Sequence, residues 1–493
     1  MHPVGNEPGW KVLNRGCGDE YSRPLLGSEL LNDQFAQCFD GFSECCMGFT
    51  FETRIPFDEF CSSVRHAWAH LRFRCPNIAA SLETIHDPQL RSWVYRPATS
   101  QEDIAHWLQN SVIIHPEPTD VQEFISETIY GRLEDRPGRF IMYCIIFPVR
   151  GRENVFGVFM HGSHALMDPR ATMNAFKIMC SKMVESKPSP FEDLAWGTEW
   201  KNLPDGPVTS TGGPLPGWEE RGAPILSRYL EAQTVKPDTW TLCPQRRDIT
   251  DHGRAIRVRS YIQPPEVLAL TQAVKAGGFS MDQLFQAAQA LAVCKMNPIP
   301  EDQLENAHVS FPHVILSLDR WRTDPNKDQF VSGQTFMSVR IDHTLIASSL
   351  PPKEKLCAIM TSLKLQSEFF LKNEHLPHLC AAMMALNPPR TMRVAANRFT
   401  TGVTNIGVVD RIIPLEWVVD GGVGDSAARG EPLFRLSEWF LGVRYTEPNP
   451  TTHVWTMGSK MCVQVMAADT WDKDYLQRYA DEIIQQALNL LIC

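Results

Sequence analysis

The chain has 493 residues, of which 43% are hydrophobic and 21% charged, and its formal net charge is −10. A chain of this length exceeds one ordinary core and fits two large lobes. Its composition is that of a folded globular protein. The negative charge argues against nucleic acid as a partner, and no apolar run approaches the length of a membrane span.

The cysteines and the N-terminus bear on the cellular compartment. The 14 cysteines form no C-x-x-C pair or zinc-ligand spacing, and two of them, Cys45 and Cys46, are adjacent, which suits a disulfide framework poorly. We therefore expect reduced, mostly buried thiols. Residues 1–18 are polar and lack the apolar core of a signal peptide. A cytoplasmic monomer without membrane contact is the expectation.

Helices and strands alternate in the first part of the chain, from residue 29 to about 194. Strands are predicted over 47–55, 140–149 and 155–160, and helices over 57–73 and 121–133. In the first of these helices Phe60, Val64, Trp68 and Leu71 fall on one face. This alternation predicts a mixed sheet covered by helices, the α/β (α+β) class.

The most informative stretch, residues 160–168, follows the strand that ends at Met160. It places His164 four positions before Asp168, and Asp168-Pro169 reads as an N-cap followed by the first helical residue. The helix is predicted from Arg170 to about Val184. The loop that carries the histidine is therefore fixed at both ends.

Histidine has the unperturbed pKa nearest neutrality, so a neutral His164 could act as a general base, with Asp168 orienting the loop. Two alternatives remain open on the spacing alone. Asp168 could be only a helix cap and His164 an ordinary loop residue. His161, His164 and Asp168 could also form a facial triad for a metal ion, although the spacing is loose and no metal is expected.

Composition changes after residue 202. Residues 203–217 contain eight prolines and glycines, which indicate a turn-rich connector. We assign residues 1–202 to an N-terminal lobe that carries the His164 loop, 203–254 to the connector and 255–493 to a C-terminal lobe. Limited proteolysis is expected to cut first between 203 and 217.

The second lobe repeats the alternation of the first without repeating its sequence. Strands are predicted over 256–262, 309–318, 335–341, 401–409, 436–443 and 461–467. Helices are predicted over 265–276, 282–296, 352–372 and 475–491, and Gly277-Gly278 marks the end of the first of them.

Five motifs in the same order resemble those of the chloramphenicol-acetyltransferase-like and condensation-domain-like superfamily. Residues 164–168 resemble its His-x-x-x-Asp motif, and 191–196 its Tyr-x-Asp-Tyr-Ala-x-Trp motif. Residues 279–288 resemble the helix that opens its second lobe, 333–340 a strand bearing an arginine, and 403–407 the Ser-Asn-Leu-Gly strand. The resemblance covers most of the chain and is closest to free-standing fungal O-acetyltransferases of secondary metabolism, such as the trichothecene 15-O-acetyltransferase family.

Three departures qualify the resemblance. Pro169 stands where most members have glycine, and Ser163 replaces the first histidine of the His-His pair in condensation domains. No Asp-Phe-Gly-Trp-Gly motif occurs near the C-terminus, which argues against a plant-type enzyme of the superfamily.

The resemblance implies two pseudo-equivalent lobes with the active histidine in a tunnel between them. It implies that His164 and Asp168 are catalytic and that Asp168 pairs with an arginine of the second lobe. Arg340 is the first choice for that arginine and Arg320 the reserve. Six further residues are expected to line the tunnel: His161, Ser163, Thr404, Asn405, Thr456 and Ser459.

The resemblance also implies a function. We expect an acyltransferase that moves acetyl from acetyl-CoA to a hydroxyl of a secondary metabolite, with no tightly bound cofactor and with His164 as the general base. The alternative is an amide-forming or cyclising enzyme that acts on a carrier-protein-tethered or free intermediate. A third hypothesis is a degenerate, non-enzymatic domain that serves only as a docking module.

Overall fold

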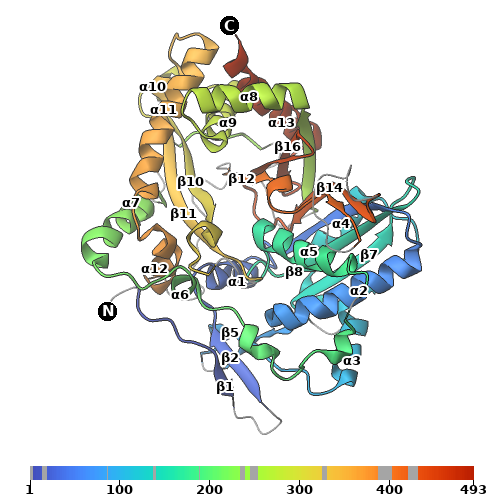
Figure 1. The fold of residues 1–493 in the computed structure, drawn as a ribbon. Helices are drawn as coiled ribbons and strands as arrows, with labels where there is room; N and C mark the ends of the chain where they lie inside the picture. Colours follow the sequence, from blue (N-terminus) through green and yellow to red (C-terminus); the bar gives the residue numbers. More distant parts are fainter. Residues whose placement is uncertain are drawn as a thin grey trace.

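The structure is a computed structural model and describes residues 4–13, 19–85, 87–136, 140–187, 189–233, 239–244, 254–324, 330–386, 402–419 and 431–492. It has the predicted mixed α/β architecture, with two lobes whose sheets are covered by helices (Figure 1). Among the described residues, no helix has the length and apolarity needed to cross a membrane.

The first lobe surrounds a six-stranded sheet with the order β13-β14-β3-β8-β7-β6. Its strands are β3 (Cys45–Thr53), β6 (Val112–Ile114), β7 (Met142–Pro148), β8 (Val155–Gly162), β13 (Glu416–Trp417) and β14 (Phe434–Val443). Its helices are α2 (Phe57–Arg74), α3 (Gln101–Ser111), α4 (Val121–Tyr130) and α5 (Pro169–Met183).

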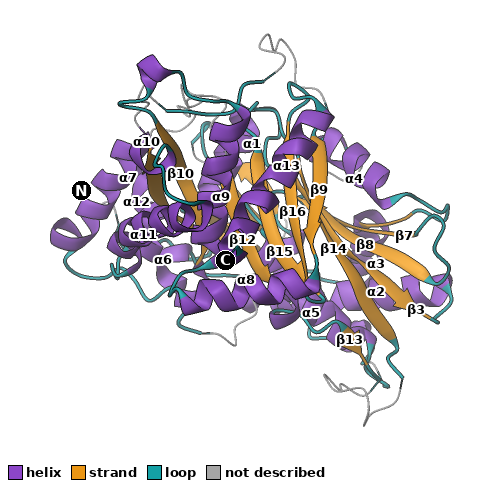
Figure 2. Cartoon of the chain, turned by 90° about the horizontal axis from the view of Figure 1, so that it is seen from above, coloured by secondary structure: helices purple, strands orange, loops and turns teal. Residues whose placement is uncertain are grey.

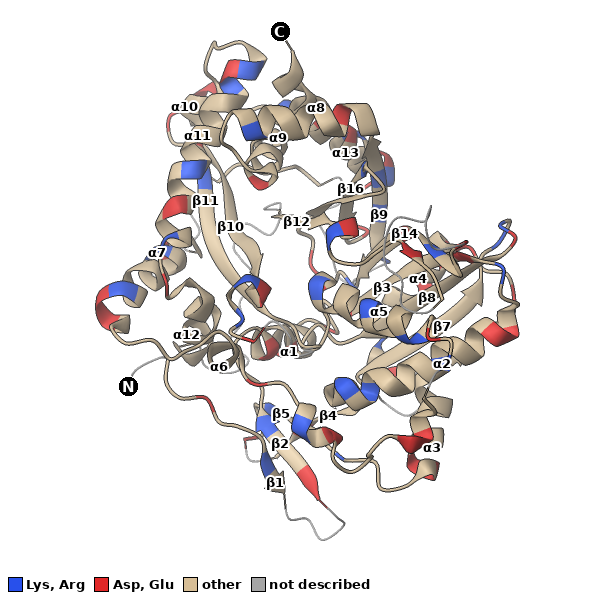
Figure 3. Cartoon of the chain, in the orientation of Figure 1, with Lys and Arg blue, Asp and Glu red and all other residues tan. Residues whose placement is uncertain are grey.

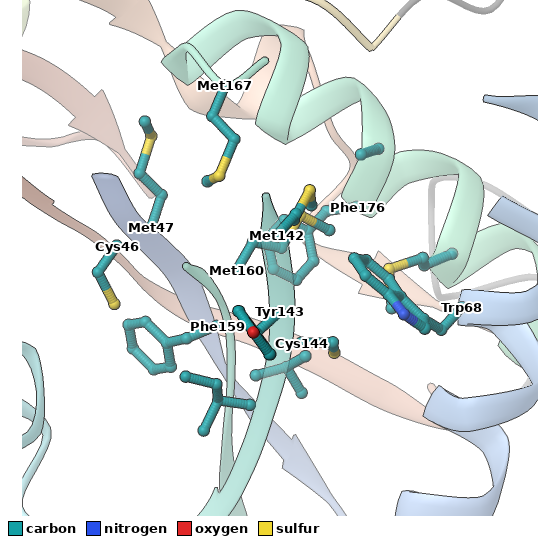
Figure 4. Close-up of a cluster of buried hydrophobic side chains, with 14 of the residues drawn as sticks. Cys46, Met47, Trp68, Met142, Tyr143, Cys144, Phe159, Met160, Met167 and Phe176 are labelled. Atoms are coloured by element: carbon teal, nitrogen blue, oxygen red, sulfur yellow. The ribbon is translucent and has the colours of Figure 1, made fainter. Parts of the chain in front are cut away.

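Helices cover both faces of this sheet. Phe49 of β3 contacts Phe176 of α5, with ring centroids 5.1 Å apart. Phe159 of β8 points to the other face and contacts Phe124 of α4 at 5.2 Å. Because both faces are buried, β7 and β8 are almost continuously apolar instead of alternating. Figure 4 shows part of this core, where Met167 points from the loop before α5 into the cluster around Met47 and Met142.

The second lobe contains a four-stranded sheet, β12-β15-β16-β9, and a two-stranded sheet, β10-β11. The strands are β9 (Ile256–Ile262), β10 (His308–Ser317), β11 (Gln334–Asp342), β12 (Gly402–Val408), β15 (Thr451–Met457) and β16 (Lys460–Ala467). The helices are α8 (Pro264–Ala276), α9 (Met281–Met296), α10 (His343–Ile346), α11 (Pro352–Leu371), α12 (Leu379–Leu386) and α13 (Lys473–Leu488).

The four-stranded sheet lies between the second lobe's helices and the first lobe (Figure 2). Val454 and Val463 belong to the core that contains α9 and α13. The next residues along the strands, Trp455 and Cys462, belong to the core of the first lobe. Successive side chains alternate between faces, so one face of this sheet packs on the first lobe.

A smaller sheet, β1-β2-β5-β4, and helix α1 (Ser28–Cys38) complete the fold. The strands of this smaller sheet are β1 (Lys11–Leu13), β2 (Glu20–Pro24), β4 (Ser81–Thr84) and β5 (Arg91–Tyr95). Helix α1 contacts α12 of the second lobe. It therefore lies where the two lobes meet.

Two features correct the predicted division of the chain. Strands β13 and β14 come from the C-terminal part but pair within the first lobe's sheet, where β14 lies antiparallel to β3. The connector contains α6 (Pro207–Ser210) and α7 (Ala223–Gln233), and its Trp218 and Tyr229 are buried in the second core. A linear cut at residues 203–254 therefore does not separate two independent units.

The thiols and surface charges agree with an ordinary globular protein. All twelve cysteines within the described residues are free, and most of them are buried. In Figure 3, lysine and arginine are interspersed with aspartate and glutamate over the outer helices.

Candidate active site

The loop between β8 and α5 is closed by backbone hydrogen bonds around Ser163. The Ser163 N–H donates to the Ile141 carbonyl at 2.9 Å, and the Ser163 carbonyl accepts from Leu166 and Met167. Gly162 has no room for a side chain, because a Cβ there would lie 2.5 Å from the Met167 sulfur and 2.9 Å from the Ile141 carbonyl oxygen. The loop is therefore rigidly attached to the end of β8.

Asp168 fixes the other end of the loop and joins the two lobes. As the N-cap of α5, its Oδ1 accepts from the Ala171 N–H at 2.8 Å, which confirms the predicted cap. Its Oδ2 accepts from the Gly333 N–H of the second lobe at 3.0 Å. One oxygen of this carboxylate therefore caps α5, and the other connects the loop to the second lobe.

The surroundings of Asp168 disfavour its charged form and so raise its pKa. Burial raises the pKa of Asp168 to about 6, and nearby Asp319 adds to this rise. The N–H groups of Ala171 and Gly333 and the guanidinium of Arg322 oppose it. Asp168 is therefore ionised at neutral pH and begins to take up a proton about two pH units above an ordinary aspartate.

His164 lies at the centre of this loop, half-buried, and burial lowers its pKa. The backbone groups of His164 itself and of Met167 oppose that shift. Of its two ring nitrogens, only Nδ1 is fully enclosed by the protein. A neutral imidazole with Nε2 free to meet a reactant is the form that a general base requires.

Asn32 of α1 bonds the backbone of His164. The sequence did not reveal this residue as part of the site. Its buried Nδ2 donates to the His164 carbonyl at 3.2 Å and to the Ser332 Oγ at 3.2 Å. Beside it, the Ser28 hydroxyl donates to the Ser332 carbonyl at 3.0 Å and accepts from the Gln334 N–H at 3.1 Å. Helix α1 thus holds the His164 loop against the start of β11.

A charged network crosses the lobe boundary next to Asp168. Arg170 of α5 donates to the Asp319 carboxylate at 3.1 Å, and Arg322 donates to the other oxygen of Asp319 at 2.8 Å. Arg322 also lies against Gly333, because a Cβ on that glycine would come 3.1 Å from its guanidinium. Arg322 of the second lobe therefore acts on Asp168 through the surrounding network.

The predicted pairing of Asp168 with Arg340 is wrong. The Arg340 side chain is 45% exposed and pairs with Asp342 at 3.1 Å. A strand advances about 3.3 Å per residue, so Arg340 lies roughly 23 Å along β11 from Gly333, the residue that does bond Asp168. The reserve choice, Arg320, is exposed and lies over the Trp321 ring at 4.6 Å.

His161 does not line a site with His164. It lies within β8, where it is opposite Cys46 and Tyr143, and it is fully buried. Burial, with Arg136 and Arg444 adding to it, lowers the pKa of His161 well below its usual value. Within the described residues, no three His, Cys, Asp or Glu side chains are grouped to hold a metal ion, so the facial-triad alternative has no geometric support.

The four predicted tunnel residues of the second lobe do not share one face. Thr404 is opposite His453 on the face that packs on the first lobe. Asn405 points the other way, where its Oδ1 accepts from the Gly407 N–H at 2.9 Å and its side chain bonds Asp282 at the start of α9. Thr456 lies on the same side as Val454, and Ser459 is exposed in the turn before β16. Of these four residues, Thr404 lies on the sheet face toward the first lobe.

Ser163 has a structural part in the loop, since its Oγ accepts from the Ala165 N–H at 3.3 Å. His453 of β15, in contrast, is a buried residue near His164 that the sequence motifs did not reveal. No local sequence signal marked Asn32 or His453, because Asn32 is followed by the polar residues Asp33 and Gln34 and His453 follows two threonines.

The sequence comparisons give two distant relatives and no matching family model. An acyl-CoA-dependent acyltransferase, MAC2 of Pseudozyma antarctica, is 24% identical over 174 residues, or 34% of this chain and 31% of the relative. An acyl-CoA-dependent acyltransferase, MAC1 of Mycosarcoma maydis, is 21% identical over 148 residues, which are 29% of this chain and 25% of the relative. The matches thus span a third or less of these relatives.

The structural similarity extends over nearly the whole chain. The TRI3 trichothecene 15-O-acetyltransferase of Fusarium sporotrichioides aligns with a TM-score of 0.81 and 16% identity, covering 98% of this chain and 97% of that one. The condensation domain of the monacolin K polyketide synthase MokA aligns with a TM-score of 0.61 and 10% identity, covering 95% and 96%.

A third solved structure is the starter condensation domain of the rhizomide synthetase RzmA, a mutant in complex with C8-CoA and Leu-SNAC. It aligns with a TM-score of 0.60 and 12% identity, over 96% of this chain and 95% of that one. At these identities the likeness concerns the fold. The chain therefore has the two-lobed fold of the chloramphenicol-acetyltransferase-like and condensation-domain-like superfamily, as its motifs predict.

Proposed function

We propose that this protein is an acyltransferase that moves an acyl group from acyl-CoA, with acetyl as the first candidate, to a hydroxyl of a small molecule. The observation that carries the proposal is the neutral His164 on a loop anchored to both lobes. The distant acyl-CoA-dependent relatives and the fold shared with TRI3 support the same reaction class.

In the proposed mechanism His164 Nε2 takes the proton of the acceptor hydroxyl while the oxygen attacks the thioester carbonyl. The tetrahedral intermediate collapses to the ester and expels the CoA thiolate, which receives the proton from the imidazolium. No covalent acyl-enzyme is needed. The protein contributes a base in the correct protonation state and a site where both reactants lie in line.

The supports of His164 fit this role. Asn32 fixes its backbone, Asp168 fixes the following turn, and burial keeps the imidazole neutral. A base needs this arrangement because a misplacement of about 1 Å can cost on the order of a hundredfold in rate.

The proposal is tested by identifying the product. The protein is incubated with acetyl-CoA and a panel of alcohols and amines, and mass spectrometry detects acetylated products alongside free CoA. We expect an acetyl ester with stoichiometric CoA release. Amide products alone would favour the condensation-like alternative, and the absence of transfer from acetyl-CoA and longer acyl-CoA donors would contradict the proposed reaction.

A further inference from the structure

His453 is a buried imidazole on the second lobe that lies close to His164. It is 7% exposed and sits on β15 between Thr404 of β12 and Gln464 of β16. These partners share the sheet face that packs on the first lobe. The two imidazoles are near enough that a positive charge on His164 would disfavour protonation of His453 and so lower its pKa.

Gln464, the neighbour of His453 on β16, has its hydrogen bonds satisfied. Gln464 donates to the Leu441 carbonyl at 3.1 Å and accepts from the Arg259 Nε at 2.9 Å. His453 itself makes no hydrogen bond to any described residue, and only its Nδ1 is fully enclosed. Buried polar groups are nearly always hydrogen-bonded, so an unpaired imidazole at this position needs an explanation.

Other buried histidines of the chain differ from His453. His161 and His378 also lack hydrogen-bond partners among the described residues, but both ring nitrogens are enclosed in each of them. In His453 only Nδ1 is enclosed, and the ring lies on the sheet face that packs on the first lobe. Burial first, and then His164, lower the pKa of His453 to about 4, so the ring is neutral and offers one donor and one acceptor.

We propose that His453 binds the acyl acceptor by hydrogen-bonding a neutral hydroxyl of that substrate next to His164. This inference rests on the proposed acyl transfer and identifies a polar, hydroxyl-bearing acceptor as its ligand. A neutral ring suits a neutral hydroxyl, because neither group has to lose a charged hydration shell on binding.

A ligand-binding role and a purely structural role of His453 predict different effects of substitution. Since the fold supplies no hydrogen-bond partner to His453, an apolar side chain of similar size removes an unpaired polar group from the interior. Such a change leaves the fold intact or makes it more stable. A ligand-binding role predicts that acceptor binding weakens in the same variant.

The experiment compares His453→Leu with the parent protein and with the control His378→Leu, which removes a buried, unpaired imidazole elsewhere. The measurements are KM for the alcohol found in the product screen, KM for acetyl-CoA, acceptor-free acetyl-CoA hydrolysis and the melting temperature. His453→Leu is expected to raise KM for the alcohol at least tenfold. The acetyl-CoA KM and hydrolysis should stay within twofold, without a lower melting temperature.

His453→Phe, which retains a planar ring, is the second variant in case the leucine variant does not fold. His378→Leu should leave KM for the alcohol unchanged. A folded His453 variant with the parental KM for the alcohol would overturn the role of His453 alone. Failure of the parent protein to transfer acyl groups would instead overturn the proposed function.

Discussion

At the scale of single residues, Asp168 combines two duties. It accepts one N–H from its own helix and one from the other lobe, and it stays ionised at neutral pH although burial raises its pKa to about 6. The sequence predicted the helix cap because capping is local. It could not show the Gly333 contact, whose partners are 165 positions apart.

Asp168→Asn should separate these duties. Asparagine caps helices as well as aspartate, but its Nδ2 would face the Gly333 N–H, donor against donor. The lost bond costs about 1–3 kcal/mol, and removal of a buried charge offsets it. We expect turnover to fall at least roughly tenfold, with a melting temperature near that of the parent at pH 7.5, as steady-state kinetics and thermal unfolding will show.

The same variant provides a pH test. The folded protein holds the Asp168 carboxyl with a pKa of about 6, above the ordinary 3.8, so it binds this proton more tightly than the unfolded chain does. The contribution of Asp168 to stability therefore rises as pH falls from about 6 to 4, by up to about 3 kcal/mol. The parent should gain stability relative to Asp168→Asn over this window; an unchanged difference would mean that the pKa is not raised.

At the scale of elements, helix α1 and the strand register decide the geometry of the site. The starts of β9 and α5 follow the sequence prediction closely, because β-branched alternation and an Asp-Pro cap are local signals. The sequence prediction missed β15, and with it His453. Which sheet a strand joins depends on long-range pairing. The pairing of β14 with β3 in the first lobe's sheet could therefore not be predicted from the position of β14 in the chain.

Asn32 is expected to position His164 through α1. In Asn32→Leu the His164 carbonyl and the Ser332 hydroxyl lose their shared donor, and the loop is no longer fixed to β11. The loss of about 1.4 kcal/mol of transition-state positioning would lower kcat roughly tenfold, with KM little changed. Gln37→Ala, on the same helix, is the control. A parental kcat in folded Asn32→Leu would show that the loop holds its own shape.

The arginine nearest to Asp168 can be identified by double-mutant cycles. Arg340→Met should leave activity within twofold and combine additively with Asp168→Asn, within about 0.5 kcal/mol, because it pairs with Asp342. Arg322→Met should couple with Asp168→Asn by about 1 kcal/mol, since it borders Gly333. Coupling to Arg340 and none to Arg322 would contradict this geometry.

At the scale of the whole molecule, the lobes are joined by strand exchange as well as by the charged network of Arg170, Asp319 and Arg322. The glycines and prolines of residues 203–217 predicted a cleavable connector. Composition alone could not show that Leu203, Val208 and Trp218 are buried against the lobes. The chain is therefore expected to behave as one cooperative unit.

Limited proteolysis and calorimetry check this expectation. The region 203–217 should resist an initial cut, and thermal unfolding should give one transition, because unfolding either lobe removes strands or core contacts from the other. Early cleavage within 203–217 followed by two stable fragments would restore the linear division of the chain into two lobes.

The central claim is that His164 is the general base for acyl transfer, and the most direct measurement is the turnover of His164→Ala. The product screen supplies the acceptor, and CoA release measures the rate. A positioned general base contributes about 10²–10⁴ in rate, so turnover should fall at least roughly a hundredfold while circular dichroism is unchanged. Turnover within a few-fold of the parent in a folded His164→Ala protein would contradict the claim.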